Sequence, residues 1–185
     1  MNASLVASRY AKALLLRVGE TGGGPRVYAQ ARALERAFAG VPSLRDHLEE
    51  NPEITEAQRR SLLQAAVGAD PLAPEWEALF RLMEQNGRMP VLQLVVNSFI
   101  RQYLRSEGKV HATLRTVKAS RDLEEAVRRT VSARTGWELE LETEEDPSLL
   151  GGFVLEVDDL LLDASVKHQL DAVRRAFAEQ NRRIV

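Results

Sequence analysis

Apolar residues in the first hundred positions recur at helical spacing, and glycine and proline interrupt them at intervals. Within residues 1–18, one face of a helix would hold Val6, Tyr10, Ala13, Leu14 and Val18. Proline favours the first turn of a helix, and glycine favours the position just after the last turn. These signals divide this half into about six helices, which start near residues 1, 25, 43, 55, 75 and 90.

Two of the predicted starts have capping-box spacing, in which a polar residue three positions later completes the cap. They pair Ser43 with Asp46 and Thr55 with Gln58. The run after Pro90 is apolar on more than one side, which favours burial against several neighbours. We expect it to be the central helix of a bundle. Its apolar positions are Leu92, Leu94, Val95, Val96, Phe99, Ile100, Tyr103 and Leu104.

At Gly108 the spacing changes, and we place a domain boundary there. Residues 109–119 alternate as a strand, and a helix follows over residues 121–135. The segment WELELE also alternates, with Trp137, Leu139 and Leu141 expected to face inward. GFVLEV and LLLDA predict a hairpin before a last helix from residue 165 to about 183. The predicted fold is mainly α: an N-terminal six-helix bundle over residues 1–107, then a small α/β domain over residues 108–185.

Composition limits the possible functions. At 185 residues and 44% hydrophobic content the chain can build a real core, and its net charge of -2 supplies no basic field for nucleic acid. The absence of cysteine excludes disulfides, thiolate zinc sites and thiol catalysis. No apolar run approaches the roughly 18 to 20 residues of a membrane span. We expect neither nucleic-acid binding nor direct membrane insertion.

Charge is unevenly distributed along the second half. Residues 138–163 hold ten acids and no Lys or Arg, whereas residues 165–183 hold five basic and two acidic side chains. Solvated faces explain most such runs, and a polarised surface for a partner remains an alternative.

The segment DPSLLGGFVLEVDDLLLDASVKHQL, residues 146–170, is the strongest candidate for chemistry. Gly151 and Gly152 lack the Lys-Ser or Lys-Thr of a phosphate loop, so a bulge or a close backbone approach at a strand start is favoured. Turn and cap roles account for its carboxylates, whose spacing differs from that of a calcium loop. We expect no catalytic residue, no metal and no cofactor. The turn and cap positions are Asp158, Asp159, Asp163 and Ser165.

Three blocks in order carry a family resemblance. They are RYAKAL at residues 9–14, the Asn86 and Arg88 pair before a long helix, and the 146–170 segment. The sequence resembles the delta subunits of bacterial F-type ATP synthases, counterparts of the mitochondrial oligomycin-sensitivity-conferring protein. Pro90, directly after Met89, departs from the pattern at the entry to the sixth helix.

The resemblance implies a stator subunit that performs no chemistry and links the catalytic head to the peripheral stalk, at the cytoplasmic face of the bacterial plasma membrane. The N-terminal helix of an alpha subunit would bind between the first and fifth helices, and the stalk b subunits would bind the last helix. The implied alpha-subunit contacts are Tyr10, Ala13, Leu14, Leu79, Phe80 and Met83. The implied stalk contacts are Val173, Arg174 and Phe177.

Two other functions remain open at this point. A general helical adaptor unrelated to ATP synthase would share the bundle and not the partners. A metal-dependent hydrolase would use the acidic stretch that contains Asp158 and Asp159.

Overall fold

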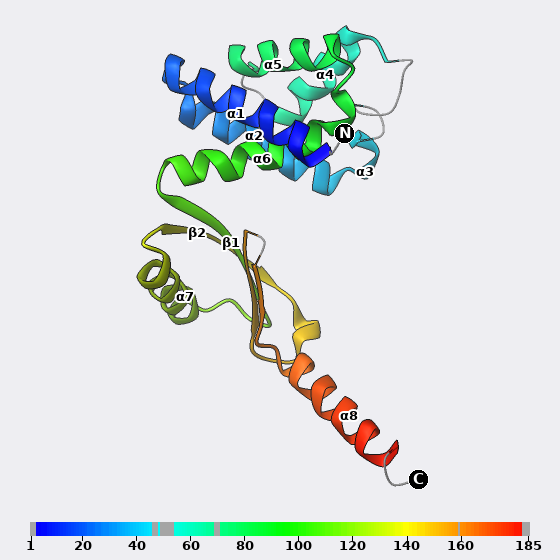
Figure 1. Cartoon of the computed structure of the whole chain (residues 1–185), viewed down its shortest axis with the longest axis vertical. Helices are drawn as coiled ribbons and strands as arrows, with labels where there is room; N and C mark the ends of the chain where they lie inside the picture. The colour runs from blue at the N-terminus through cyan, green and yellow to red at the C-terminus, as the bar shows by residue number, and fades with distance from the viewer. Residues whose placement is uncertain (1–2, 46–47, 49–53, 69–70, 159, 183–185) are drawn as a thin grey trace. The chain divides into compact units, whose positions relative to one another are not determined.

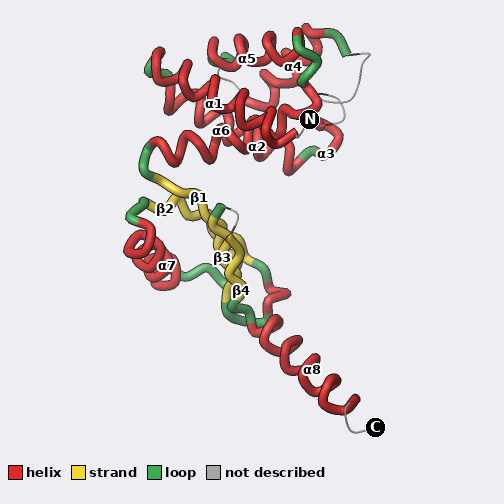
Figure 2. Tube along the Cα trace, in the orientation of Figure 1, coloured by secondary structure: helices red, strands yellow, loops and turns green. Residues whose placement is uncertain are grey.

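The structure is a computed structural model that describes residues 3–45, 48, 54–68, 71–158 and 160–182. The chain divides into two compact units, Met1–Ser106 and Glu107–Val185. It is mainly helical, with a small four-stranded sheet in the second unit (Figures 1 and 2).

Helices build the N-terminal unit. In chain order they are α1 (Ala3–Thr21), α2 (Gly24–Gly40), α3 (Pro42–Arg45), α4 (Glu56–Val67), α5 (Pro74–Gln85), the 3-10 helix η2 (Met89–Val91) and α6 (Leu92–Ser106). Helix α3 begins before Ser43, so Ser43 is not its cap, and Asp46 lies outside the described residues. Pro90 sits inside η2, and α6 proper begins at Leu92; proline has no backbone N–H and disfavours a helical conformation at the residue before it.

The predicted capping box at the start of α4 is confirmed. The backbone N–H of Gln58 donates to Thr55 Oγ1 at 3.3 Å, and the N–H of Thr55 donates to Gln58 Oε1 at 2.9 Å. Both donors would otherwise lack a partner at the helix start.

The core of the unit is centred on α6, which packs against α1 and α2. Trp76 of α5 is fully buried there, stacked on Phe80 with ring centroids 5.3 Å apart and edge-on to Phe99 at 5.7 Å. Its indole N–H donates to the carbonyl of Val27 at 3.1 Å. One aromatic side chain therefore ties α2, α5 and α6 together.

A buried amide fixes the segment that leads into α5. The side chain of Gln30 donates to the carbonyl of Pro71 at 2.9 Å and accepts from the N–H of Ala73 at 2.9 Å. Buried backbone groups without partners are costly. Gln30 is one of three helix side chains that bond this loop: Arg26 also donates to the Pro71 carbonyl at 2.7 Å, and Gln64 accepts from the N–H of Leu72 at 2.9 Å.

The C-terminal unit combines a sheet with two helices. Its elements are β1 (Lys109–Thr116), α7 (Arg121–Thr135), β2 (Glu138–Glu145), the 3-10 helix η3 (Pro147–Leu149), β3 (Phe153–Val157), β4 (Leu160–Asp163) and α8 (Val166–Arg182). The strand order is β2-β1-β3-β4. β1 pairs in parallel with β2, while β3 is antiparallel to both β1 and β4.

Helix α7 covers one face of this sheet. Val127 of α7 joins Leu114 of β1, Leu139 of β2 and Leu155 of β3 in a single apolar cluster. The expectation for Trp137 is wrong: the strand starts one residue later, after the left-handed Gly136, and Trp137 is 39% exposed.

We expect Trp76→Ala to lower the free energy of unfolding of the N-terminal unit by about 3–5 kcal/mol, because it leaves a cavity and removes the indole hydrogen bond to the Val27 carbonyl. Chemical denaturation of the full chain, followed by circular dichroism, measures this loss. Trp137→Ala is the matched control and should cost about 1 kcal/mol or less, since its ring is partly exposed. Equal losses at the two tryptophans would contradict the central role of Trp76.

Candidate interaction surfaces

The glycine pair before β3 lets two backbone segments meet. Gly152 has φ +73°, and a Cβ placed on it would lie 2.2 Å from the carbonyl oxygen of Ala164. The carbonyl of Gly151 accepts from the N–H of Val166 at 3.0 Å, and that of Phe153 accepts from Ala164 at 2.9 Å. The pair therefore serves a close approach between the start of the hairpin and the start of α8.

The described carboxylates of this segment lie at the β3–β4 turn and just before α8. β3 and β4 pair from Val154 with Asp163 to Val157 with Leu160, and the chain turns at Asp158, whose φ is +51°. Asp159 lies outside the described residues. Asp163 accepts from the N–H of Ser165 at 2.9 Å, and the Ser165 hydroxyl caps α8 by accepting from the N–H of His168 at 3.1 Å.

Hydrogen bonds also set the acidity of these groups. The bonds from Ser165 hold the pKa of the Asp163 carboxyl below its usual value, and those from Ser148 do the same for the pKa of Asp146. Both carboxylates are thus stabilised as anions that brace the backbone. Within the described part of the chain, no three Asp, Glu or His side chains gather as a metal site would require.

The residues expected to contact an alpha subunit do not form an open apolar surface. Leu14, Leu79, Phe80 and Met83 are buried in the core, Tyr10 is half-buried against it and Ala13 is exposed. Most of the predicted contact residues lie on the apolar stripes of α1 and α5. In the structure these stripes face the core.

Other apolar side chains of this unit are exposed instead. On α1 these are Leu5 and Leu16, at 52% and 63%, and on α5 Leu82, at 44%. Arg9, Lys12 and Arg17 are exposed on α1 as well. In the sequence, these exposed leucines are the ones that lie outside the main apolar stripe of each helix.

A buried carboxylate joins α1 to α5. Glu75, in the first turn of α5, is only 9% exposed, and a hydrogen bond with the side chain of Thr21 is the main cause that lowers its pKa. Arg17 and Arg26 act in the same direction, whereas burial opposes them. The Glu75 carboxylate therefore links the start of α5 to the end of α1.

The expected stalk contacts lie on α8. Arg174 is exposed and lies 3.9 Å from the Asp171 carboxylate. The side chains of Val173 and Phe177 fall outside the described residues. The first two positions of the same stripe, Val166 and Leu170, are 38% and 48% exposed.

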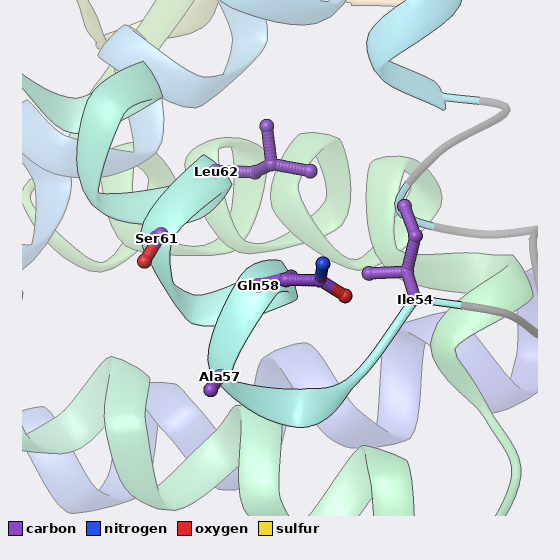
Figure 3. Close-up of a pocket in the computed structure, with 5 residues that line it drawn as sticks. All are labelled: Ile54, Ala57, Gln58, Ser61 and Leu62. Atoms are coloured by element: carbon purple, nitrogen blue, oxygen red, sulfur yellow. The ribbon is translucent and has the colours of Figure 1, made fainter.

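A hollow of about 510 Å³ beside α4 was not foreseen from the sequence (Figure 3). Its lining is uncharged and comprises Ile54, Ala57, Gln58, Ser61 and Leu62. Such a lining offers apolar contact and amide or hydroxyl hydrogen bonds, and no acid, base or nucleophile pair.

The helical unit and the small α/β unit both leave apolar side chains exposed, and the described residues hold no metal cluster, which favours a protein that binds other proteins. The sequence profile of the ATP synthase delta (OSCP) subunit family matches residues 6–177. The chain belongs to this family.

Similar proteins agree with that assignment. The ATP synthase subunit delta of Phocaeicola vulgatus is 32% identical over 186 residues, covering all of both chains, and that of Bacteroides fragilis is 32% identical over 190 residues, again covering both fully. A chain in the mitochondrial ATP synthase hexamer of Toxoplasma gondii has the same fold, with a TM-score of 0.68 at 22% identity over 93% of this chain and 97% of that one.

The family resemblance of the three sequence blocks is thereby confirmed, and the chain is a structural stator subunit of ATP synthase rather than an enzyme. None of the helices in the described residues is long and apolar enough to cross a membrane.

We expect Gly152→Ala to destabilise the C-terminal unit by about 3–5 kcal/mol, from left-handed strain plus the collision with the Ala164 carbonyl. Gly136→Ala is a matched control, because Gly136 has the same φ of +73° and open space around it. It should cost about 1–2 kcal/mol. Hydrogen exchange of the β3 and β4 amides measures the difference, and equal losses would contradict the close approach.

We expect acid to weaken the N-terminal unit through Glu75. Because its folded-state pKa lies below the ordinary 4.5, its contribution is complete above that value and is lost as the pH falls through the folded-state pKa. Glu75→Gln should therefore show a shallower loss of stability than wild type in urea titrations from pH 5 downward. Glu77→Gln, in the same helical turn, should keep the wild-type slope.

Proposed function

We propose that the N-terminal unit, acting as a six-helix bundle, binds the catalytic head of ATP synthase, and that the C-terminal unit binds the b subunits of the peripheral stalk. The family assignment over residues 6–177 carries this proposal. A link of this kind resists the torque that the rotor exerts on the head. It works from the cytoplasmic face of the bacterial plasma membrane, as a peripheral component.

A link under torque needs slow dissociation. An affinity near nanomolar corresponds to about -12 kcal/mol, and differences in such affinities lie mostly in the dissociation rate. The two attachments must also be on separate parts of the chain, and the division between Ser106 and Glu107 supports this requirement.

On the head side, the proposed occupant is the amphipathic N-terminal helix of an alpha subunit. Helix-in-groove recognition needs apolar side chains that the folded chain leaves exposed. Leu82 of α5 and Ala13 of α1 meet this condition on two helices that pack together, and Tyr10 of α1 is half-buried against the core. The buried Leu14, Leu79, Phe80 and Met83 support this surface from beneath.

The basic side chains of α1 suit a partner helix with acidic flanking residues. Arg9, Lys12 and Arg17 precede the first acid of the helix, Glu20, and Arg17 also pairs with it at 3.1 Å. Opposite charges steer encounter and fix orientation more than they add affinity.

On the stalk side, α8 offers an exposed apolar stripe that starts at Val166 and Leu170. Its basic residues, including the exposed Arg174, flank the stripe. Val173 and Phe177 continue the same spacing in the sequence, and we propose them as further contacts.

The test uses the full-length chain and a synthetic peptide that covers the N-terminal helix of the same organism's alpha subunit. Ala13→Glu and Leu82→Glu should each weaken binding at least about tenfold, because each places a charge in the apolar contact. Leu94→Glu on α6 is the matched control, since Leu94 is 43% exposed and Leu82 is 44% exposed. Isothermal titration measures the affinities, and a wild-type chain that binds no peptide at tens of micromolar would overturn the proposal.

A further inference from the structure

The chain has one asparagine that is followed directly by glycine, the Asn86–Gly87 pair at the end of α5. Glycine has no side chain to shield its backbone nitrogen, so that nitrogen can approach the asparagine side chain closely. Both residues are exposed, and a Cβ placed on Gly87 would meet nothing within 4 Å apart from its own chain neighbours. The pair is therefore open to water.

The reaction available to this pair is deamidation through a cyclic imide. The backbone nitrogen of Gly87 loses its proton and bonds to Cγ of Asn86. The Cγ–Nδ2 bond then breaks, and the amide nitrogen leaves with that proton as ammonia. Water adds to one of the two carbonyl carbons of the ring and opens it. The product at position 86 is aspartate or isoaspartate, and nothing is oxidised or reduced.

The cap of α5 holds the attacking nitrogen. The backbone N–H of Gly87 donates to the carbonyl of Glu84 at 3.0 Å, and the N–H of Arg88 donates to that of Met83 at 2.8 Å. Gly87 has a φ of +62°, in the left-handed region. These two bonds and the left-handed glycine form a Schellman motif, which ties down the last carbonyls of the helix.

The side chain under attack is held as well. Nδ2 of Asn86 donates to the carbonyl of Leu82 at 2.7 Å, one turn back along α5. Ring closure requires both this bond and the bond from the Gly87 N–H to open. Helix ends open locally at a much smaller cost in free energy than the whole unit does. The reaction is therefore confined to moments when the last turn of α5 is open.

We propose that Asn86 is a site at which the chain modifies itself, by deamidation to aspartate or isoaspartate, and that opening of the last turn of α5 sets the rate. The only other reactant is water. The modification does not rest on the proposed function, because both reacting groups belong to this chain.

The product weakens the turn that limits the reaction. A carboxylate in place of the Asn86 amide turns a donor to the Leu82 carbonyl into a negative group beside it, at the negative end of the helix dipole. Isoaspartate also adds a carbon to the backbone, which displaces Gly87 from its cap position. Leu82 is a proposed contact for the catalytic head, so the modification acts on that surface.

The first test incubates the full-length chain at mildly alkaline pH for a month and follows the masses of its tryptic peptides. Cleavage after Arg81, Arg88 and Arg101 places Asn86 and Asn97 in separate peptides. Asn97 is the internal control, because a serine follows it inside α6. Asn86 should gain one mass unit at least about tenfold faster than Asn97, whose helix interior opens less often.

Isoaspartate forms only through the cyclic imide, so its presence at Asn86 identifies the route. A month without isoaspartate at Asn86, or equal rates at Asn86 and Asn97, would overturn the proposal.

The second test isolates the effect of the cap. A synthetic peptide with the sequence of residues 82–88 has the same reacting pair without the folded helix. It should deamidate at least about tenfold faster than the folded chain, because every molecule of the peptide is open. Equal rates in the peptide and the folded chain would mean that the cap does not control the reaction.

The third test compares two changes from amide to carboxylate in the full-length chain. Asn86→Asp has the charge of the product, while Gln85→Glu changes the neighbouring exposed residue and keeps the bond from Asn86 to Leu82. Hydrogen exchange of the Gly87 and Arg88 amides should be about fivefold faster in Asn86→Asp than in Gln85→Glu. Equal exchange in the two variants would contradict the predicted weakening of the turn.

The same two variants connect the modification to the head contact. In the titration with the alpha-subunit peptide, Asn86→Asp should bind at least about threefold more weakly than Gln85→Glu. Equal binding overturns the effect on the head contact. A wild-type chain that binds no peptide overturns the proposed function, whereas isoaspartate at Asn86 would still support the modification.

Discussion

An apolar surface can be buried only once, and this constraint governs the whole molecule. A helix with one apolar stripe must choose between its own core and a partner, because burial of that stripe is what holds it in place. In the N-terminal unit the stripes of α1, α5 and α6 all belong to one core cluster, which includes Trp76 and Phe99. What remains for a partner is the set of leucines beside the stripes, such as Leu82.

In the C-terminal unit, by contrast, part of the apolar surface is left exposed. Among the residues that the structure describes, α7 packs on a sheet of four strands, and Leu160 and Leu162 of β4 are exposed outside the cluster that it forms. The last helix of this unit also leaves Val166 and Leu170 exposed.

Backbone contacts at the glycine pair, together with the Ser165 side-chain cap, fix where α8 starts. Gly151 and Gly152 permit the chain before β3 to lie against Ala164 and Val166, and the Ser165 cap then starts the helix. A residue with a Cβ at Gly152 would separate these segments. The acidic, glycine-containing segment over residues 146–170 first suggests a catalytic or metal site. In the structure it fixes the start of α8.

The sequence alone determined which segments are helices and strands, where the spacing changes near Gly108, and the cap at Thr55. These features depend on neighbours within a few positions, so local periodicity and turn residues are enough to predict them. The three motif blocks also identified the family.

Only the tertiary structure decided which face of each element is free. Leu14 and Leu79 belong to the core, while Leu82 and Leu160 are exposed, although all four are leucines in regular elements. Trp137 was predicted wrongly for a local reason: the alternating pattern includes it, but the strand begins one residue later, at Glu138. Exposure depends on which elements pack together, and that is set by contacts between residues far apart in the chain.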